Sequence, residues 1–257
     1  MDLTIWLAVP AGLLVGFLIG LTGMGGGALM TPFLLIVMKM NPIAAVATDL
    51  MYASVTKLVG GYQHYRHSAV ELDKVAWMAC GSLPASFLGA RIILGFNTNP
   101  QVVDQILPNV LGIVLILVSL IIFARISRLV GPKEYIELHW PSPPLLILVG
   151  AVGGVLVGLT SIGGGTVIMA LMLLFFSIPL NEMVGLDVLH GAVLALFSAL
   201  TYALAGQTDW PVVGLLLIGS LPGVWLGARA INHVDRRVVR GILSVLVLGA
   251  GIHLMLH

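Results

Sequence analysis

Two eight-residue segments carry the residues of this sequence best suited to binding an anion. GLTGMGGG runs from Gly20 to Gly27, and GLTSIGGG runs from Gly158 to Gly165, 138 positions later without a gap. Consecutive glycines interrupt a helix, because glycine has high backbone entropy and no side chain to pack. A helix that restarts after such a break presents unpaired N–H groups and the positive end of its dipole, which attract anions.

Hydroxyl groups in the two segments add hydrogen-bond donors for oxyanion oxygens. A helix-packing role without any ligand is the alternative, since glycine is common in membrane helices. Two segments in register favour the ligand role, because broken helices at matching places in two repeats mark transporter binding sites. The predicted substrate-binding residues are Thr22, Gly23, Gly25, Gly26, Gly27, Thr160, Ser161, Gly163, Gly164 and Gly165.

Two acidic residues lie inside apolar stretches, where an ionisable group is costly and therefore a candidate for function. Asp49 and Asp187 are again 138 positions apart. Because a fixed negative charge would repel an anion, the functional interpretation makes these acids proton carriers that are neutral when the anion binds. The alternative is a hydrogen bond to a neighbouring helix or to a glycine segment. His190, one helical turn after Asp187, is either a proton relay or a hydrogen-bonded structural histidine.

Three basic residues are candidates for gates or anchors. Lys57 follows Asp49 by two helical turns and has Ala195 at the equivalent position of the second half. It either offsets buried charge or extends towards the inner interface. Arg91 and Arg229 follow glycine-rich segments, and they either attract anions at a gate or anchor helix ends at the membrane interface.

The composition indicates an integral membrane protein. Hydrophobic residues make up 59% of the chain and charged residues 9%, whereas about 25% of the residues in a soluble domain are charged. The apolar runs are long and continuous, so they predict helices. The net charge of +1 and the scattered basic residues argue against a nucleic-acid partner. No metal-ligand cluster or nucleophile–base pair stands out, so we predict no enzyme, no metal and no cofactor.

The glycine segments divide the chain into two repeats of one plan. Leu3 to Val37 holds no charged side chain and is too long for a single helix, since about 20 residues cross the hydrocarbon core. The predicted helices cover 3–21, 26–38, 42–62, 74–96 and 104–124, then 145–160, 165–176, 181–205, 211–230 and 235–256. We predict an all-α polytopic membrane protein with a first transmembrane repeat (1–124), a cytoplasmic linker (125–144) and a second transmembrane repeat (145–257). Each repeat begins with a glycine-broken helix hairpin that three transmembrane helices follow.

Further residues recur at the same offset of 138, which indicates internal duplication. The matching segments are Gly81-Ser82-Leu83-Pro84 with Gly219-Ser220-Leu221-Pro222, and Leu88-Gly89-Ala90-Arg91 with Leu226-Gly227-Ala228-Arg229. Gly12, Gly16 and Gly20 likewise match Gly150, Gly154 and Gly158. Small residues at this spacing along one helix face let another helix approach closely.

The distribution of Lys and Arg favours inverted repeats, because cytoplasmic loops carry the excess of these residues. If each glycine hairpin returns to its side of entry, nine basic residues share one side and only Lys39 and Arg91 lie on the other. Parallel repeats divide the same residues five against six. We therefore predict that both termini lie outside and that the linker is cytoplasmic.

The glycine segments, the repeated Gly-Ser-Leu-Pro and Leu-Gly-Ala-Arg segments and Asp209-Trp210 together resemble the sulfite exporter TauE/SafE family, also called the toluene-sulfonate uptake permease family. The resemblance covers nearly the whole chain. It implies a bacterial or archaeal-type inner-membrane carrier for sulfite, sulfonates or related organosulfur anions, driven by the proton gradient. Thr48-Asp49 and Leu186-Asp187 stand where members of the family commonly have Thr-Ser.

The residues and the resemblance predict the same function. This is a secondary transporter of a small sulfur-containing oxyanion of the sulfite, sulfonate or thiosulfate type, working by alternating access with protons as the candidate coupling ion. An anion channel with the same central site is the alternative. The expected partners are the small anionic substrate, protons and the lipid bilayer, while oligomeric state is left open.

Overall fold

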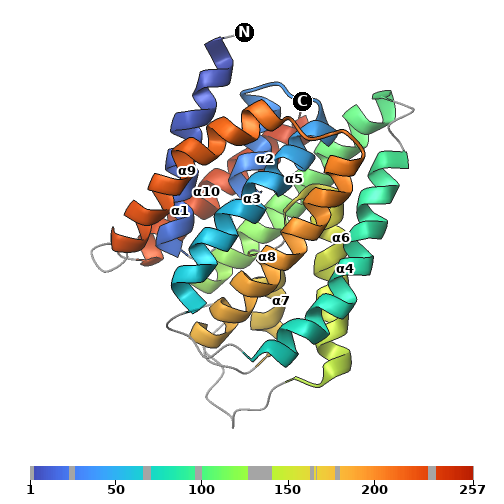
Figure 1. The fold of residues 1–257 in the computed structure, drawn as a ribbon, viewed down its shortest axis with the longest axis vertical. Coiled ribbons are helices and arrows are strands. Elements are labelled where there is room, and N and C mark those ends of the chain that lie inside the picture. Colours follow the sequence, from blue (N-terminus) through green and yellow to red (C-terminus); the bar gives the residue numbers. More distant parts are fainter. Residues whose placement is uncertain are drawn as a thin grey trace.

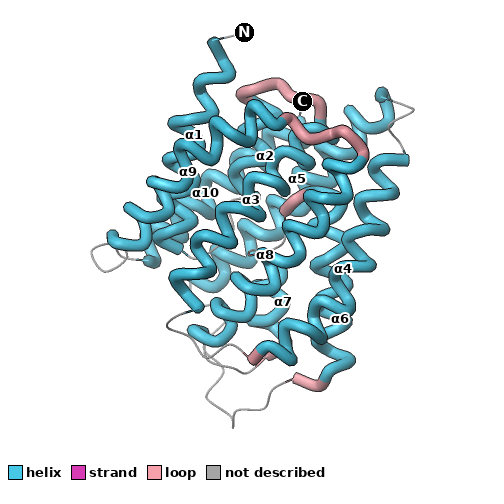
Figure 2. The backbone as a smooth tube through the Cα atoms, viewed as in Figure 1, coloured by secondary structure: helices cyan, strands magenta, loops and turns pink. Residues whose placement is uncertain are grey.

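The described residues form a bundle of helices and contain no strand, which confirms the all-α fold class (Figures 1 and 2). The computed structural model describes residues 3–22, 27–65, 71–95, 100–126, 141–162, 165, 167–176, 180–230 and 236–256. The elements are the 3₁₀-helix η1 (Leu3–Leu7) and the α-helices α1 (Ala8–Thr22), α2 (Gly27–Ile36), α3 (Pro42–Tyr65), α4 (Leu72–Gly95), α5 (Pro100–Ile126), α6 (Pro143–Thr160), α7 (Val167–Phe175), α8 (Leu180–Leu204), α9 (Trp210–Ala230) and α10 (Arg236–Leu256).

Both glycine segments separate two helices, as predicted. α1 ends at Thr22 and α2 begins at Gly27, while α6 ends at Thr160 and α7 begins at Val167. The helices that follow the breaks are short, with 10 residues in α2 and 9 in α7. At 1.5 Å per residue they are about 15 and 14 Å long, roughly half the thickness of the hydrocarbon core. Neither α2 nor α7 therefore crosses a membrane alone.

The helices α5 and α6 extend beyond their predicted limits. α5 begins at Pro100 and α6 at Pro143, before the predicted starts at 104 and 145, because proline fits the first helical turn, where its missing N–H is not needed. α5 also continues to Ile126, into the segment predicted as linker. Among the described residues, five helices are long and apolar enough to span a membrane: α4, α5, α6, α8 and α9.

Helices of one half pack against helices of the other half. α1 packs against α9, and the equivalent helix α6 packs against α4. In the first pair, a β-carbon added to Gly12, Gly16 or Gly20 would lie 2.3, 2.5 or 2.3 Å from a backbone carbonyl oxygen of α9. In the second pair, a β-carbon on Gly154 would lie 2.3 Å from the carbonyl oxygen of Ser82. These backbone contacts confirm the predicted close approach at the small-residue faces.

The contacts also define the relative directions of the paired helices. Along α4 and α6 the contacting residues rise together, from Met78 with Gly150 to Ser86 with Gly158, so these helices are parallel. α5 and α10 are the last helices of their respective halves, and they run antiparallel. The Ser119 hydroxyl on α5 donates to the carbonyl oxygen of Ser244 on α10 at 2.8 Å. Figure 1 shows both chain ends at the same end of the bundle.

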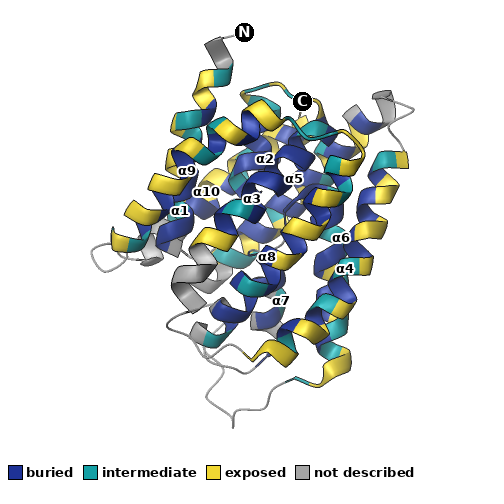
Figure 3. Ribbon diagram, viewed as in Figure 1, coloured by how far each residue is buried: buried dark blue, intermediate teal, exposed yellow. Residues whose placement is uncertain are grey.

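The interior of the bundle is buried and its periphery is exposed and apolar (Figure 3). Large apolar side chains such as Leu88 of α4 and Ile218 of α9 are 60% and 64% exposed. In an aqueous protein such a surface would be unfavourable, whereas lipid chains solvate it. α3 and α8 lie in the centre of the bundle and pack against each other (Figure 1).

Replacing Gly154 with Ala tests the backbone contact between α4 and α6. The added β-carbon would approach the carbonyl oxygen of Ser82 to 2.3 Å and its Cα to 2.7 Å, and neither backbone atom can move without shifting the helix. We expect a loss of about 1–3 kcal/mol in the free energy of unfolding, measured by thermal unfolding in detergent. Gly214→Ala is the matched control, because nothing lies within 4 Å of its β-carbon position. An equal loss in both variants would contradict the contact.

Candidate functional site

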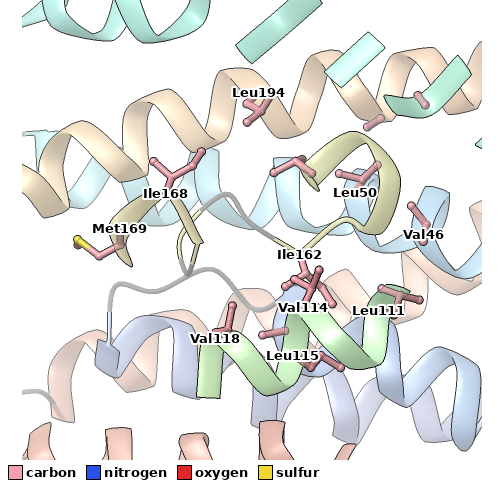
Figure 4. Packing of buried hydrophobic residues seen from close by; sticks show 14 of the residues in the cluster. Val46, Leu50, Leu111, Val114, Leu115, Val118, Ile162, Ile168, Met169 and Leu194 are labelled. Atoms are coloured by element: carbon pink, nitrogen blue, oxygen red, sulfur yellow. The ribbon is translucent and has the colours of Figure 1, made fainter. Parts of the chain in front are cut away.

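The second glycine segment turns through backbone conformations that favour glycine. Ser161 has φ 62° and ψ −15°, a left-handed conformation, and its N–H donates to the carbonyl oxygen of Val157 at 2.8 Å. Gly165 has φ 146°, which a side chain would strain. Ile162 anchors the turn, because it is fully buried in the hydrophobic cluster that also holds Leu50 of α3 and Val114 of α5 (Figure 4). A non-glycine residue held in the left-handed region is a pointer to a functional position.

Asp49 joins the two halves of the protein through its carboxyl group. The residue lies on α3 and is fully buried. Its Oδ2 accepts a hydrogen bond from the Thr31 hydroxyl of α2 and a second one, at 2.7 Å, from the Ser161 hydroxyl of the second glycine segment. Its Oδ1 has no hydrogen-bond partner among the described residues. One carboxyl group therefore links three separate elements.

The start of α2 lies directly against this contact. A β-carbon built on Gly27, the first residue of α2, would lie 2.9 Å from the carbonyl oxygen of Ser161 and 3.3 Å from Asp49 Oδ2. The end of the first glycine segment and the turn of the second thus meet in the protein interior. The arrangement places a carboxyl oxygen beside the N-terminal end of a helix, where negative charge is favoured.

The second buried acid has a different environment. Asp187 on α8 is 1% exposed, and its Oδ1 has no hydrogen-bond partner among the described residues. One turn later, His190 is fully buried and its Nε2 shares a 2.8 Å hydrogen bond with the hydroxyl of Ser82 on α4. His190 Nδ1 has no hydrogen-bond partner in the part of the chain that is described.

The internal repeat explains why the two acids differ. At an offset of 138, Met169 takes the place of Thr31, and Gly23 takes the place of Ser161. The two hydroxyl donors of Asp49 therefore have no equivalents around Asp187. Thr31 was not singled out from the sequence, because this residue lies inside an apolar helix. The presence of apolar Met169 at the equivalent position of the other repeat could have marked Thr31 as a polar exception.

Lys57 is the basic residue of this buried centre. Its side chain on α3 is only 8% exposed, and it lies close enough to Asp49 and Asp187 to interact electrostatically with both. The equivalent position on α8 is Ala195. The side chain is thus buried near two buried acids, and its role as a charge offset stays a prediction.

Of the remaining predicted substrate-binding side chains, the described part of the chain includes that of Thr160. The Thr160 hydroxyl donates to the carbonyl oxygen of Leu156 at 2.6 Å, so it is engaged within its own helix. The backbone of Gly23, Gly25, Gly26, Gly163 and Gly164 and the side chain of Thr22 fall outside the described part. In the part that is described, no group of three or more His, Cys, Asp or Glu side chains is arranged to hold a metal ion.

The two arginines predicted as gates or anchors lie away from the buried centre. Both are exposed. The guanidinium of Arg91 lies 5.3 Å from the ring centre of Phe87, and that of Arg229 lies 3.5 Å from the ring centre of Trp225. Each arginine thus stacks on an aromatic residue one turn earlier on its own helix, a cation–π contact typical of an interfacial anchor.

The fold and its buried polar centre define a polytopic helical membrane protein whose sequence repeats at an offset of 138 residues. The family model described as sulfite exporter TauE/SafE matches residues 8–254, so the chain belongs to the TauE/SafE family. It is a multi-pass membrane transporter rather than an enzyme, and it acts on a small molecule in a lipid environment.

Relatives from bacteria and archaea carry matching descriptions. The probable membrane transporter protein YjnA of Bacillus subtilis is 37% identical over 252 residues, which cover 95% of this chain and 97% of the relative. The probable membrane transporter protein YdhB of the same organism is 22% identical, with coverage of 94% and 96%. The probable membrane transporter protein MJ0441 of Methanocaldococcus jannaschii is 24% identical, with coverage of 97% and 96%. No solved structure matches the chain at a significant level.

Replacing Ser82 with Ala tests whether the buried histidine depends on its partner. The variant leaves His190 Nε2 without its 2.8 Å hydrogen bond, and an unsatisfied buried polar group costs about 1–3 kcal/mol. We expect that loss in the free energy of unfolding, measured by denaturation in detergent. Ser220→Ala is the control from the other repeat, because the Ser220 hydroxyl is 3.5 Å from that of Thr56 and should contribute less. A larger loss in the control would contradict this assignment.

Proposed function

We propose that this protein is a secondary transporter of a small sulfur-containing oxyanion of the sulfite, sulfonate or thiosulfate type. The observation that carries the proposal is the contact of Ser161 with Asp49 beside Gly27. It brings a hydroxyl donor, the start of a helix and an acidic group together in the protein interior. The family model is described as sulfite exporter TauE/SafE, and membership of this family supports a sulfur oxyanion as the substrate.

The chemistry of this centre suits a small oxyanion that travels with protons. Helix N-termini and hydroxyl groups bind oxyanion oxygens without a fixed positive charge, so the ion can also leave. Lys57 supplies positive charge nearby. Asp49 and Asp187 are the proton carriers in this proposal, and His190 is the candidate relay.

Alternating access is supported by the way the two halves are paired. We propose that the repeats are inverted, with boundaries near those drawn from the sequence, 1–124 and 145–257. The antiparallel contact of α5 with α10 supports inversion, since these are equivalent helices of the two halves. The reciprocal pairs α1 with α9 and α6 with α4 support it as well. Inverted repeats can exchange their conformations and thereby open the site to either side in turn.

The proposed orientation in the inner membrane follows from the basic residues and predicts the outcome of reporter fusions. We expect an alkaline phosphatase fused after the C-terminus of the chain to be active in the bacterial periplasm, because both termini are placed outside. The same reporter inserted at residue 133, in the proposed cytoplasmic linker, should be inactive. The measurement is phosphatase activity in whole cells, normalised to the amount of fusion protein. Equal activity at the two positions would contradict the inverted arrangement.

Uptake into liposomes tests the proposed function directly. The purified protein is reconstituted and offered sulfite, thiosulfate, sulfate, sulfoacetate and taurine, each with and without a pH gradient. We expect accumulation of a sulfur oxyanion that increases when protons can move with it, because the buried acids must be neutral for an anion to bind. Protein-free liposomes are the control. Absence of uptake for every compound would refute the substrate class, and a current far above carrier turnover would replace the carrier with a channel.

A further inference from the structure

We propose that the carboxylate of Asp49 is an internal surrogate for the transported anion. The carboxylate occupies the anion's position at the start of α2 until a substrate anion replaces it. This inference rests on the proposed function and names the residue that controls its binding step. The hydroxyl group and the helix end that suit a substrate are already engaged with an oxyanion, namely the carboxyl group of the protein itself.

Burial opposes a charge on Asp49, and three features of its surroundings stabilise the carboxylate against that cost. Oδ2 accepts hydrogen bonds from both Thr31 and Ser161. It also lies beside Gly27, the first residue of a ten-residue helix, where the unpaired N–H groups carry partial positive charge. Lys57 adds a nearby positive charge. The same combination of donors would hold one oxygen of a sulfite or sulfonate group.

Asp49 and a substrate anion cannot share these donors. A hydroxyl group has one proton to donate, so Ser161 can serve either the carboxylate or the substrate. Two negative charges side by side in a low-dielectric interior also repel each other strongly. Substrate binding therefore requires Asp49 to release the hydroxyl of Ser161 and to lose its charge.

The unpartnered Oδ1 of Asp49 is the atom that takes up the proton in this exchange. When Oδ1 binds a proton, the carboxyl group becomes neutral and the Ser161 hydroxyl turns to the incoming anion. When the anion leaves, Oδ1 gives the proton back to water and the carboxylate again accepts from Ser161. One proton thus accompanies each anion, and no covalent bond other than O–H changes.

Among the described residues, Tyr52 and Lys57 interact electrostatically with Asp49 from its own helix. Asp187 and His190 on α8 interact electrostatically with Lys57. The described residues of α2 and α6 carry no ionisable side chain. Asp187 is the matched comparison for Asp49, because it is the equivalent buried acid but lacks the two hydroxyl donors.

The test compares the affinity of Asp49→Asn and Asp187→Asn for sulfite, measured by isothermal titration calorimetry on the purified protein at pH 8. If Asp49 competes for the site, Asp49→Asn should bind sulfite about tenfold more tightly than the wild type. The wild type must break a hydrogen bond to the charged carboxylate before sulfite binds, whereas the variant has no charged group there. Asp187→Asn should show a clearly smaller gain, because Asp187 does not occupy the two hydroxyl donors. Equal gains in both variants would indicate a general effect of charge, and an unchanged or weaker affinity in Asp49→Asn would refute the surrogate.

Infrared difference spectroscopy separates this inference from the proposed function. Without any anion at pH 8, the spectrum of the wild type minus Asp49→Asn should show an ionised carboxylate, and a protonated carboxyl band would overturn the surrogate whatever the protein transports. Sulfite should convert that carboxylate to a carboxylic acid. An ionised band in a protein that binds no sulfite would instead count against the proposed substrate. If Asp49→Asn fails to fold, the sulfite-induced spectrum of Asp187→Asn, which keeps Asp49, reports the same conversion.

Discussion

The requirement that a buried carboxyl group find hydrogen-bond donors is the constraint on which the centre of this protein depends. Asp49 lies where neither water nor lipid can solvate it, so its charge or its dipole must be satisfied by the protein. It uses Thr31 from its own half and Ser161 from the other half. The two glycine segments are thereby held against each other. In the proposed alternating access, this contact would have to change when the halves move relative to one another.

Close packing of the surrounding helices makes that contact possible. The glycines of α1 and α6 face backbone carbonyl groups of α9 and α4, so the helix pairs approach until their backbones touch. The pairs are alike without being identical, because Ala85 of α4 stands at the position equivalent to Gly223 of α9. Each pair is parallel and combines one helix from each half. The polar centre on α3 and α8 lies between these two pairs.

The two halves repeat much of one sequence pattern, but the residues around their buried acids differ. Asp49 keeps two hydroxyl partners, whereas Met169 and Gly23 stand at the corresponding places near Asp187. Lys57 is present in only one half. Membership of the TauE/SafE family accounts for the shared architecture and the role in transport. The asymmetry around the two acids is the basis for proposing different roles for them.

The sequence alone determined the class of the protein, the break in each hairpin, the internal repeat and the close helix contacts, because these follow from composition and from glycine at regular spacing. Tertiary structure alone decided which groups meet. Ser161 and Asp49 are far apart in the chain, and nothing local brings a turn of one half onto a helix of the other. The Thr160 hydroxyl bonds to a carbonyl group of its own helix, which depends on local geometry. Arg91 and Arg229 likewise point outward, since the inner faces of their helices are filled by the neighbouring helix backbone.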